Sequence, residues 1–277
     1  MTDAYYELKD RQTLSNGAVV ATYQPTLHAQ GAWQETEQHM APATGIICHE
    51  LDIFQPQDHL RIGRVSLDIW GMIYLDEFTV TTQIERPGRT IQLLKSELKA
   101  KNRTCIVAYT WRMVTTDSSS VMGLEDQPIP SPEAFPTWTG MRTWQGGYIR
   151  SVTAKKSPES RNGAGIVWLS NSLDMVKGEP TSDFCRLMGM VDTSNGIVTR
   201  EPLGEFKWMF PNVDLQIHLF RAPQGHWLGL ETTQQFGPDG IGLTSSVLHD
   251  THGPFGRSEQ ILTVRPIPEG FKQIKHD

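Results

Sequence analysis

The sequence predicts an α+β protein built from two similar units, each an antiparallel sheet accompanied by one helix. The main observation is an internal repeat, since residues 65–70 (VSLDIW) return in altered form as residues 213–218 (VDLQIH). Each copy then passes through strand-like runs and a Pro/Gly turn to a last strand that ends in arginine, Arg112 in the first copy and Arg265 in the second. Solenoid repeats span only about 20 to 50 residues, so two domains side by side explain this longer period better.

A Pro-rich stretch between the two copies is the second observation. Residues 115–138 are rich in Ser, Asp and Pro, which is typical of a linker that crosses the surface between domains. We therefore divide the chain into an N-terminal unit over residues 1–120, a linker over 121–140 and a C-terminal unit over 141–277. A chain of 277 residues is long enough for two domains with cores of their own.

The first unit is predicted to contain a hairpin, a helix and a meander. Residues 5–23 form the hairpin, because the pair Asn16-Gly17 tolerates the positive φ angles of a tight turn. A helix is expected within residues 39–51, where Pro42 suits the first turn and the apolar residues follow helical spacing despite Gly45. Four strand-like runs with turn signals then predict an antiparallel sheet: residues 64–73, 78–85, 90–100 and 104–114.

The second unit repeats this order of elements. Residues 141–153 open it, and a Lys/Ser/Gly loop leads to a strand at 164–170. A helix is predicted over residues 181–190, with Thr181 or Ser182 available to cap its start. Four further strands are predicted at residues 212–220, 227–235, 242–249 and 257–264.

Composition excludes several classes of function. A net charge of −6 argues against nucleic acid or an anionic membrane as the main partner. No stretch approaches the roughly 18 apolar residues of a membrane helix, and the first residues do not form a signal peptide, so a cytoplasmic location is expected.

The three cysteines (Cys48, Cys105 and Cys185) lie in apolar runs without C-x-x-C spacing, which favours buried reduced thiols. The histidines share no ligand spacing, so no metal site is predicted.

Three short motifs point to a known family. They are residues 187–192 (LMGMVD), residues 212–221 (NVDLQIHLFR) and residues 258–260 (SEQ) ahead of Arg265-Pro266. With these motifs, the chain resembles the acyl-CoA thioesterase II-like group of the thioesterase superfamily. The resemblance implies a double hotdog fold, in which each sheet wraps around its own helix and the two units share one continuous sheet.

The resemblance also implies a catalytic set of an Asp on the second helix, a Thr before the next strand and a Gln on the last strand. The Asp corresponds to Asp192 and the Gln to Gln260, whereas the Thr position is occupied by Asn212, which lacks a hydroxyl. Asp192 would then take a proton from the attacking water as a general base. Asn212 and Gln260 would hold the water in line with the thioester carbonyl.

By analogy with other hotdog enzymes, the start of the first helix is the expected oxyanion site, where backbone N–H groups are available. The candidates for binding the substrate at this place are His39, Met40, Ala43 and Thr44. The acyl chain would lie in an apolar channel between the units. In the repeat, Asn212 corresponds to Arg64. Gln260 corresponds to Val107 when the closing arginines are aligned, so the first unit is expected to lack the polar set.

Each candidate also has a purely structural interpretation. Asp192 would only end the helix, Asn212 would only begin a strand, and Gln260 would only be paired across strands. Asp214, next to the Asn212 motif, is expected to brace the sheet. His39 is the alternative base, since the ordinary pKa of histidine suits chemistry near neutral pH, although a lone histidine is more often a loop residue.

Together these observations predict an acyl-CoA thioesterase-like hydrolase of fatty acid metabolism that cleaves a fatty-acyl or related thioester. It is expected to need no metal or redox cofactor, with coenzyme A only as part of the substrate. Expected partners are an acyl-CoA or acyl-carrier thioester, no nucleic acid, no inserted membrane, and further copies in a homodimer or higher homo-oligomer. Three alternatives stay open: an acyl-binding protein without catalysis, an enoyl-thioester hydratase or dehydratase, and a structural protein that binds a partner. A hydratase of this kind pairs an Asp with a His in one unit, and no such pair is evident.

Overall fold

The structure is a computed structural model and describes residues 3–268. The strands of its first half are β1 (Ala4–Thr13), β2 (Val19–Pro25), β3 (Leu60–Ile69), β4 (Phe78–Arg86), β5 (Ile91–Ala100) and β6 (Arg103–Val114). Those of its second half are β7 (Thr153–Lys156), β8 (Ala164–Ser170), β9 (Asp174–Val176), β10 (Trp208–Met209), β11 (Asp214–Leu219), β12 (Trp227–Phe236), β13 (Ile241–Asp250), β14 (Gly253–Thr263) and β15 (Arg265–Pro266). The end of the predicted C-terminal unit lies outside the described residues.

Three α-helices and five 3-10 turns complete the described part of the chain. The helices are α1 (Met40–Ile53), α2 (Gly147–Ser151) and α3 (Asp183–Val191). The turns are η1 (Leu27–Ala29), η2 (Ser119–Val121), η3 (Pro132–Ala134), η4 (Gly140–Thr143) and η5 (Asp192–Gly196).

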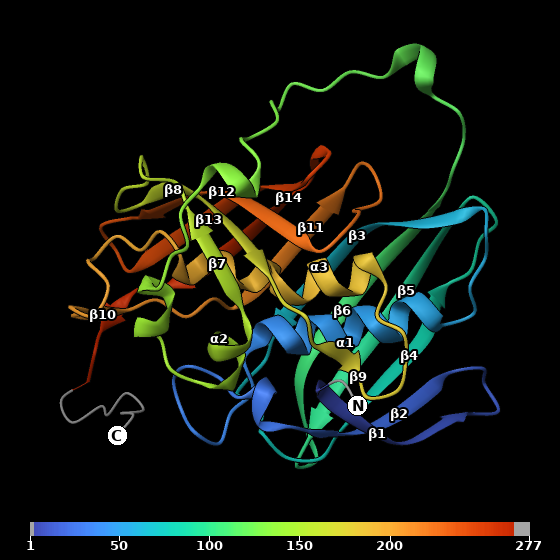
Figure 1. The fold of residues 1–277 in the computed structure, drawn as a ribbon. Coiled ribbons are helices and arrows are strands. Elements are labelled where there is room, and N and C mark those ends of the chain that lie inside the picture. Colours follow the sequence, from blue (N-terminus) through green and yellow to red (C-terminus); the bar gives the residue numbers. More distant parts are fainter. Residues whose placement is uncertain (1–2, 269–277) are drawn as a thin grey trace.

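One large sheet runs through both halves of the molecule (Figure 1). Thirteen described strands follow one another in the order β7-β8-β12-β13-β14-β11-β3-β6-β5-β4-β2-β1-β9, and β10 pairs separately with β15. The neighbours β4, β5 and β6 are antiparallel, as are β12, β13 and β14. The antiparallel sheet predicted for each unit is therefore confirmed, although the first of its four strands pairs with the last, β3 with β6 and β11 with β14.

The two halves join through the repeated segments themselves. β3 and β11 pair antiparallel at the centre of the sheet, with Leu67 opposite Leu215 and Val65 opposite Ile217. All four side chains are fully buried. Because Leu67 and Leu215 occupy the same place in the repeat, the approximate twofold centre of the molecule lies at this pair.

α1 and α3 pack against each other inside the curve of the sheet (Figure 1). α1 is buried from Met40 to Leu51 and so shows no single apolar stripe, and its buried residues include the polar Thr44, His49 and Glu50. A Cβ added at Gly45 would lie only 3.1 Å from the Cα of Gly189. The two glycines therefore allow the helix backbones to approach closely where they cross.

Several short elements were not predicted from the sequence, and β9 and α2 are the two that matter for the packing of the halves. The three-residue strand β9 runs parallel to β1, so part of the second half extends the sheet of the first half. The helix α2, which has five residues, packs against η1. The start of α3 is resolved in favour of Ser182 over Thr181, since the Ser182 hydroxyl accepts the N–H of Cys185 at 3.1 Å.

The Pro-rich segment crosses the outside of the molecule between the halves (Figure 1). Its end is attached to β8, because the indole N–H of Trp168 donates to the Pro130 carbonyl at 2.9 Å. The three thiols are buried and unpaired, as predicted: Cys48, Cys105 and Cys185.

Residues 3–268 contain neither a membrane-spanning helix nor a cluster of metal ligands. No helix there is both long and apolar enough to cross a membrane. Nor does this range contain three His, Cys, Asp or Glu side chains grouped so that they could hold a metal ion.

Candidate active site

Asp192 lies where α3 passes into the turn η5, and its side chain is almost fully buried. The turn has the sequence Asp-Thr-Ser-Asn-Gly, typical of an exposed loop, yet its first three residues are buried. Buried hydrogen bonds explain this. The Thr193 hydroxyl lies 2.6 Å from the Tyr148 hydroxyl. On the other side of the turn, Asn195 Nδ2 donates to the Phe210 carbonyl at 3.0 Å. The position of Asp192 is therefore fixed by its neighbours in the turn.

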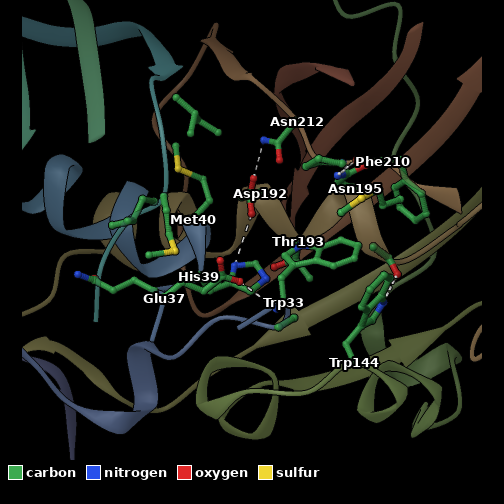
Figure 2. Close-up of a pocket in the computed structure, with 18 of the residues that line it drawn as sticks. Trp33, Glu37, His39, Met40, Trp144, Asp192, Thr193, Asn195, Phe210 and Asn212 are labelled. Carbon is green, nitrogen blue, oxygen red and sulfur yellow. Dashed lines mark hydrogen bonds and ion pairs between the residues drawn. The ribbon is translucent and has the colours of Figure 1, made fainter. Parts of the chain in front are cut away.

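The three predicted catalytic residues lie in one hydrogen-bonded cluster. Asp192 Oδ1 accepts a hydrogen bond from Asn212 Nδ2 at 2.9 Å and another from Gln260 Nε2 at 2.9 Å. Both amides therefore bind the same carboxylate oxygen. The other oxygen, Oδ2, faces His39 Nδ1 at 3.5 Å (Figure 2).

Burial raises the pKa of Asp192 from 3.8 to about 6, because the carboxylate has lost its contact with water. The hydrogen bonds from Asn212 and Gln260 oppose this rise by stabilising the charged form. Asp192 is consequently ionised at neutral pH but holds a proton more readily than an ordinary aspartate. This is a suitable pKa for a general base.

His39 comes from the other half of the chain and approaches Asp192 from the start of α1. Its Nδ1 accepts the backbone N–H of Ala41 at 3.0 Å and so caps the helix. Burial lowers the pKa of His39 to about 3, so the ring is neutral at pH 7 and carries its proton on Nε2. The ring also packs against Tyr148, with the two centroids 4.4 Å apart. The His39–Asp192 contact was not predicted, because the two residues belong to different units.

The start of α1 borders the site, and most of its backbone N–H groups are already hydrogen-bonded. The N–H of Ala41 is bound to His39, and the N–H of Ala43 is bound to the His39 carbonyl at 3.3 Å. Among the described N–H groups of this first turn, that of Met40 has no acceptor. Ala43 and Thr44 are fully buried and do not line the cavity. The expectation that these two residues contact the substrate is thus corrected, since both lie too far inside the helix pair.

A cavity of about 530 Å³ opens beside Asp192 (Figure 2). Its walls combine aromatic, thioether and aliphatic side chains with a group of polar ones, and the exposed Trp70 lies at the rim. The walls include Trp33, Met40, Met141, Trp144, Met209 and Phe210. Asp192, Asn212 and His39 also line the cavity, so a ligand inside it would meet both the carboxylate and the apolar walls.

Gln260 lies behind the carboxylate and does not line the cavity. Its side chain is 0% exposed, and its Oε1 accepts a hydrogen bond from the Ser194 hydroxyl at 2.6 Å. Both ends of the amide are therefore occupied within the protein. Gln260 therefore contacts Asp192 from the buried side, whereas Asn212 contacts it from the cavity side.

A second, smaller cleft of about 250 Å³ lies at the opposite end of the helix pair. It is bordered by the start of α3, the end of α1 and the last part of β6. These elements correspond in the repeat to those that border the first cavity. Asp192 lies three residues after Gly189 of the helix crossing. The residue three positions after its partner, Gly45, is Cys48, so Cys48 occupies the equivalent place. The second cleft is thus related to the first cavity by the approximate twofold axis, but it lacks a counterpart of the Asp192 carboxylate.

The place of Gln260 in the first half is taken by Ala108, so the prediction of Val107 was wrong by one residue. The strand registers put Val107 at the position of Glu259. The closing arginines are not equivalent in this register, because Arg112 then matches Val264, one residue before Arg265. Either residue is apolar, so the first half lacks this amide, as expected.

Comparisons with known proteins agree over most of the chain. A family model described as the acyl-CoA thioesterase N-terminal domain matches residues 29–113. A second, described as the acyl-CoA thioesterase C-terminal domain, matches residues 125–264. A search of curated proteins found no match.

Solved structures show the same fold at low identity. A conserved protein of unknown function with a hot dog fold from Alicyclobacillus acidocaldarius has a TM-score of 0.71 at 9% identity, covering 94% of this chain and 97% of the other. The acyl-CoA thioesterase II TesB2 from Mycobacterium marinum has a TM-score of 0.62 at 12% identity, covering 95% and 97%. The dehydratase domain of PpsC from Mycobacterium tuberculosis, in complex with C12:1-CoA, has a TM-score of 0.54 at 15% identity, covering 95% and 100%. The double hotdog fold predicted from the sequence is confirmed.

Proposed function

Because this chain belongs to the acyl-CoA thioesterase family, we propose that it hydrolyses the thioester bond of an acyl-CoA, with Asp192 as the general base. The observation that carries the proposal is the arrangement around this carboxylate. One of its oxygens is held by two amides, and the other is left for a ligand at the edge of an apolar cavity.

The attacking water would bind between two acceptors. One is Asp192 Oδ2, and the other is the side-chain oxygen of Asn212, for which the described residues offer no donor. Asn212 Nδ2 is occupied by Asp192 and by the Asp214 carbonyl, at 2.9 Å and 3.0 Å. The side-chain oxygen of Asn212 would thus do the work for which related proteins use a threonine hydroxyl.

The chemistry proceeds by general-base catalysis. Asp192 takes one proton from the water while the water oxygen forms a bond to the carbonyl carbon of the thioester. The carbonyl oxygen becomes an oxyanion, stabilised by the Met40 N–H and the positive end of α1. Collapse of this intermediate breaks the C–S bond, and the proton held by Asp192 passes to the departing thiolate. The products are a free acid and a thiol.

The remaining features of the proposal follow from this reaction. The acyl group would occupy the apolar part of the cavity, and the thiol-bearing arm would leave past Trp70, which is 67% exposed. Neither a metal nor a redox cofactor is required for the steps above. We place the protein in fatty acid metabolism in the cytoplasm, as a homo-oligomer whose size light scattering would measure.

An enoyl-thioester hydratase or dehydratase is the second candidate, favoured by the approach of His39 Nδ1 to Asp192 Oδ2 at 3.5 Å. It is the weaker of the two, because His39 Nδ1 is already committed to the start of α1. Purified protein assayed with saturated and α,β-unsaturated acyl-CoAs separates the candidates. Release of free thiol supports hydrolysis, whereas addition of water without thiol release supports the second candidate. Binding of acyl-CoA by calorimetry without either reaction would indicate an acyl-binding protein.

Hydrolysis is expected to depend on the ionisation of Asp192. Plotted against pH, kcat/KM should rise on the acidic side with a midpoint near pH 6, because the protonated carboxyl cannot accept a proton from water. His39 contributes no step between pH 5 and 8, since its pKa is lowered to about 3. A stopped-assay or thiol-trapping rate profile from pH 4.5 to 8.5 would measure this. A midpoint near 4 would mean that an exposed carboxylate, not Asp192, controls the rate.

Asn212 provides a second test of the same site. Asn212→Ala is expected to lower kcat about tenfold, because it removes one donor to Asp192 and one acceptor for the water. Asn212→Thr supplies a hydroxyl that reaches the same carboxylate, so it should keep more activity than the alanine variant. Steady-state kinetics with one acyl-CoA compares the three proteins. Equal rates for the alanine variant and the unchanged protein would remove Asn212 from the mechanism.

A further inference from the structure

Gln260 is held from both ends in the buried region behind the catalytic carboxylate. Its Nε2 donates to Asp192 Oδ1 at 2.9 Å, and its Oε1 accepts from the Ser194 hydroxyl at 2.6 Å. Neither Gln260 nor Ser194 lines the cavity, and both are buried. A carboxamide has a donor end and an acceptor end of nearly the same shape, so its partners decide which end faces Asp192.

We propose that Ser194 is a positioning residue that acts through Gln260. By donating to the amide oxygen, Ser194 keeps the NH₂ end of Gln260 on Asp192. The carboxylate is then held by one oxygen, and its other oxygen stays directed at the water. The effect on turnover rests on the proposed function, whereas the orientation of the amide is a property of the folded protein.

The burial of Gln260 makes the hydroxyl necessary. The Gln260 oxygen is shielded from solvent, and a buried carbonyl oxygen without a donor is unfavourable. Without the Ser194 hydroxyl, the amide would turn toward another donor and leave Asp192 with Asn212 as its single amide partner. Asp192 would then lose one of the two hydrogen bonds that lower its pKa against the effect of burial.

The other titratable groups around Asp192 would not obscure this effect. His39, at the start of α1, and Tyr148, on α2, are both neutral near pH 7, because burial lowers the pKa of His39 to about 3 and raises that of Tyr148 well above its ordinary value. Glu37 and Arg265 are the remaining charged side chains that line the same cavity. None of these four contacts Ser194 through a hydrogen bond in the described structure, so their charges should be the same in a Ser194 variant.

A double-mutant cycle tests whether Ser194 works through Gln260. Ser194→Ala is expected to lower kcat roughly three- to tenfold and to move the acidic limb of the rate profile to higher pH. KM should stay the same, because the side chain does not reach the cavity. In a Gln260→Ala background, adding Ser194→Ala should change kcat by less than about twofold. An equal effect of Ser194→Ala in both backgrounds would overturn the proposal.

A measurement without turnover separates this proposal from the proposed function. The carboxyl carbon of Asp192, followed by NMR in ¹³C-labelled protein, should titrate at higher pH in Ser194→Ala. This result would stand even if no thioester were hydrolysed, in which case only the proposed function fails. An unchanged titration of Asp192 would overturn the role of Ser194 whatever the activity.

Matched variants control for the loss of a buried hydroxyl. Ser246 is also buried on the sheet, and its hydroxyl lies 2.7 Å from that of Thr232, without contact to Asp192. Ser246→Ala should leave the Asp192 titration unchanged, which excludes a general effect of weakened packing.

If Ser194→Ala does not fold, Ser194→Cys replaces the hydroxyl with a weaker donor of similar size. The pKa of Asp192 is then expected to shift in the same direction by a smaller amount. Absence of any shift in a folded Ser194→Cys protein contradicts the proposal.

Discussion

Asp192→Asn is expected to lower thioester hydrolysis by about a thousandfold while leaving the protein at least as stable as before. The amide cannot take a proton from water, so the general base is lost. Its oxygen can still accept the hydrogen bonds of Asn212 and Gln260, and its NH₂ group would lie at the edge of the cavity, where Asp192 Oδ2 lies now. The cluster is therefore kept and only the chemistry is removed.

The stability of this variant has a defined pH dependence. The pKa of Asp192 is raised from 3.8 to about 6 in the folded protein, so folding favours the protonated form. The contribution of this group to stability is largest below pH 4 and is lost as the pH rises through 6. Since one pKa unit is worth about 1.4 kcal/mol, the carboxylate costs roughly 3 kcal/mol at pH 8. Asp192→Asn should thus raise Tm at pH 8 and change it little at pH 4.

Calorimetry at the two pH values, together with kcat, checks this prediction. Asp214→Asn is a suitable control, because Asp214 lies nearby on β11 but its carboxylate braces the sheet by accepting the N–H of Ile261 at 2.7 Å. That variant should lose stability rather than gain it. A Tm for Asp192→Asn that falls by several degrees at pH 8 would show that the charged form is the one the fold requires.

Gly147→Ala is expected to destabilise the protein by about 3 kcal/mol or more, which is large for the addition of one methyl group. A Cβ at this position would lie 1.6 Å from the carbonyl oxygen of Leu27, a backbone atom of η1 that cannot move aside easily. α2 would be pushed off the first half. Tyr148 follows directly, and it supports both His39 and Thr193. Activity should therefore fall together with stability.

Thermal unfolding and kcat of Gly147→Ala should be compared with those of Gly123→Ala. A Cβ at Gly123 meets no atom within 4 Å, so this second change adds the same group in open space. It should leave Tm and activity close to those of the unchanged protein. Wild-type behaviour of Gly147→Ala would mean that α2 does not dock on η1 under the conditions of the assay.

The fold could be predicted for those elements in which apolar and polar residues alternate or repeat regularly along the sequence. The strands that flank the Gly237-Pro238-Asp239-Gly240 turn alternate in burial, and the repeat fixed their order in both halves. β9 could not be predicted, because a three-residue strand shows no periodicity and pairs with β1 only after the chain has folded. The register error at Val107 has another cause, since the two closing arginines look equivalent in the sequence although the strand pairing matches Arg112 with Val264.

The candidate site could be predicted in part. Asp192, Asn212 and Gln260 were selected by family resemblance, and the structure places them within one cluster. His39 could be noted as a histidine before a helix, but nothing in the sequence indicates that it faces a carboxylate from the other half. Ser194 was overlooked because its turn is composed of residues that usually face solvent. Only the packing of that turn under β14 shows that its hydroxyl is buried and committed to Gln260.

The most direct test of the central claim compares two titrations of one protein. NMR of the ¹³C-labelled Asp192 carboxyl gives its pKa, with Asp192→Asn to identify the signal, and the acidic limb of kcat/KM gives the pKa that controls hydrolysis. A base buried at the junction of the two halves predicts one shared midpoint near pH 6. A carboxyl that titrates near 4, or two midpoints that clearly differ, would contradict the assignment of Asp192 as the residue that activates water.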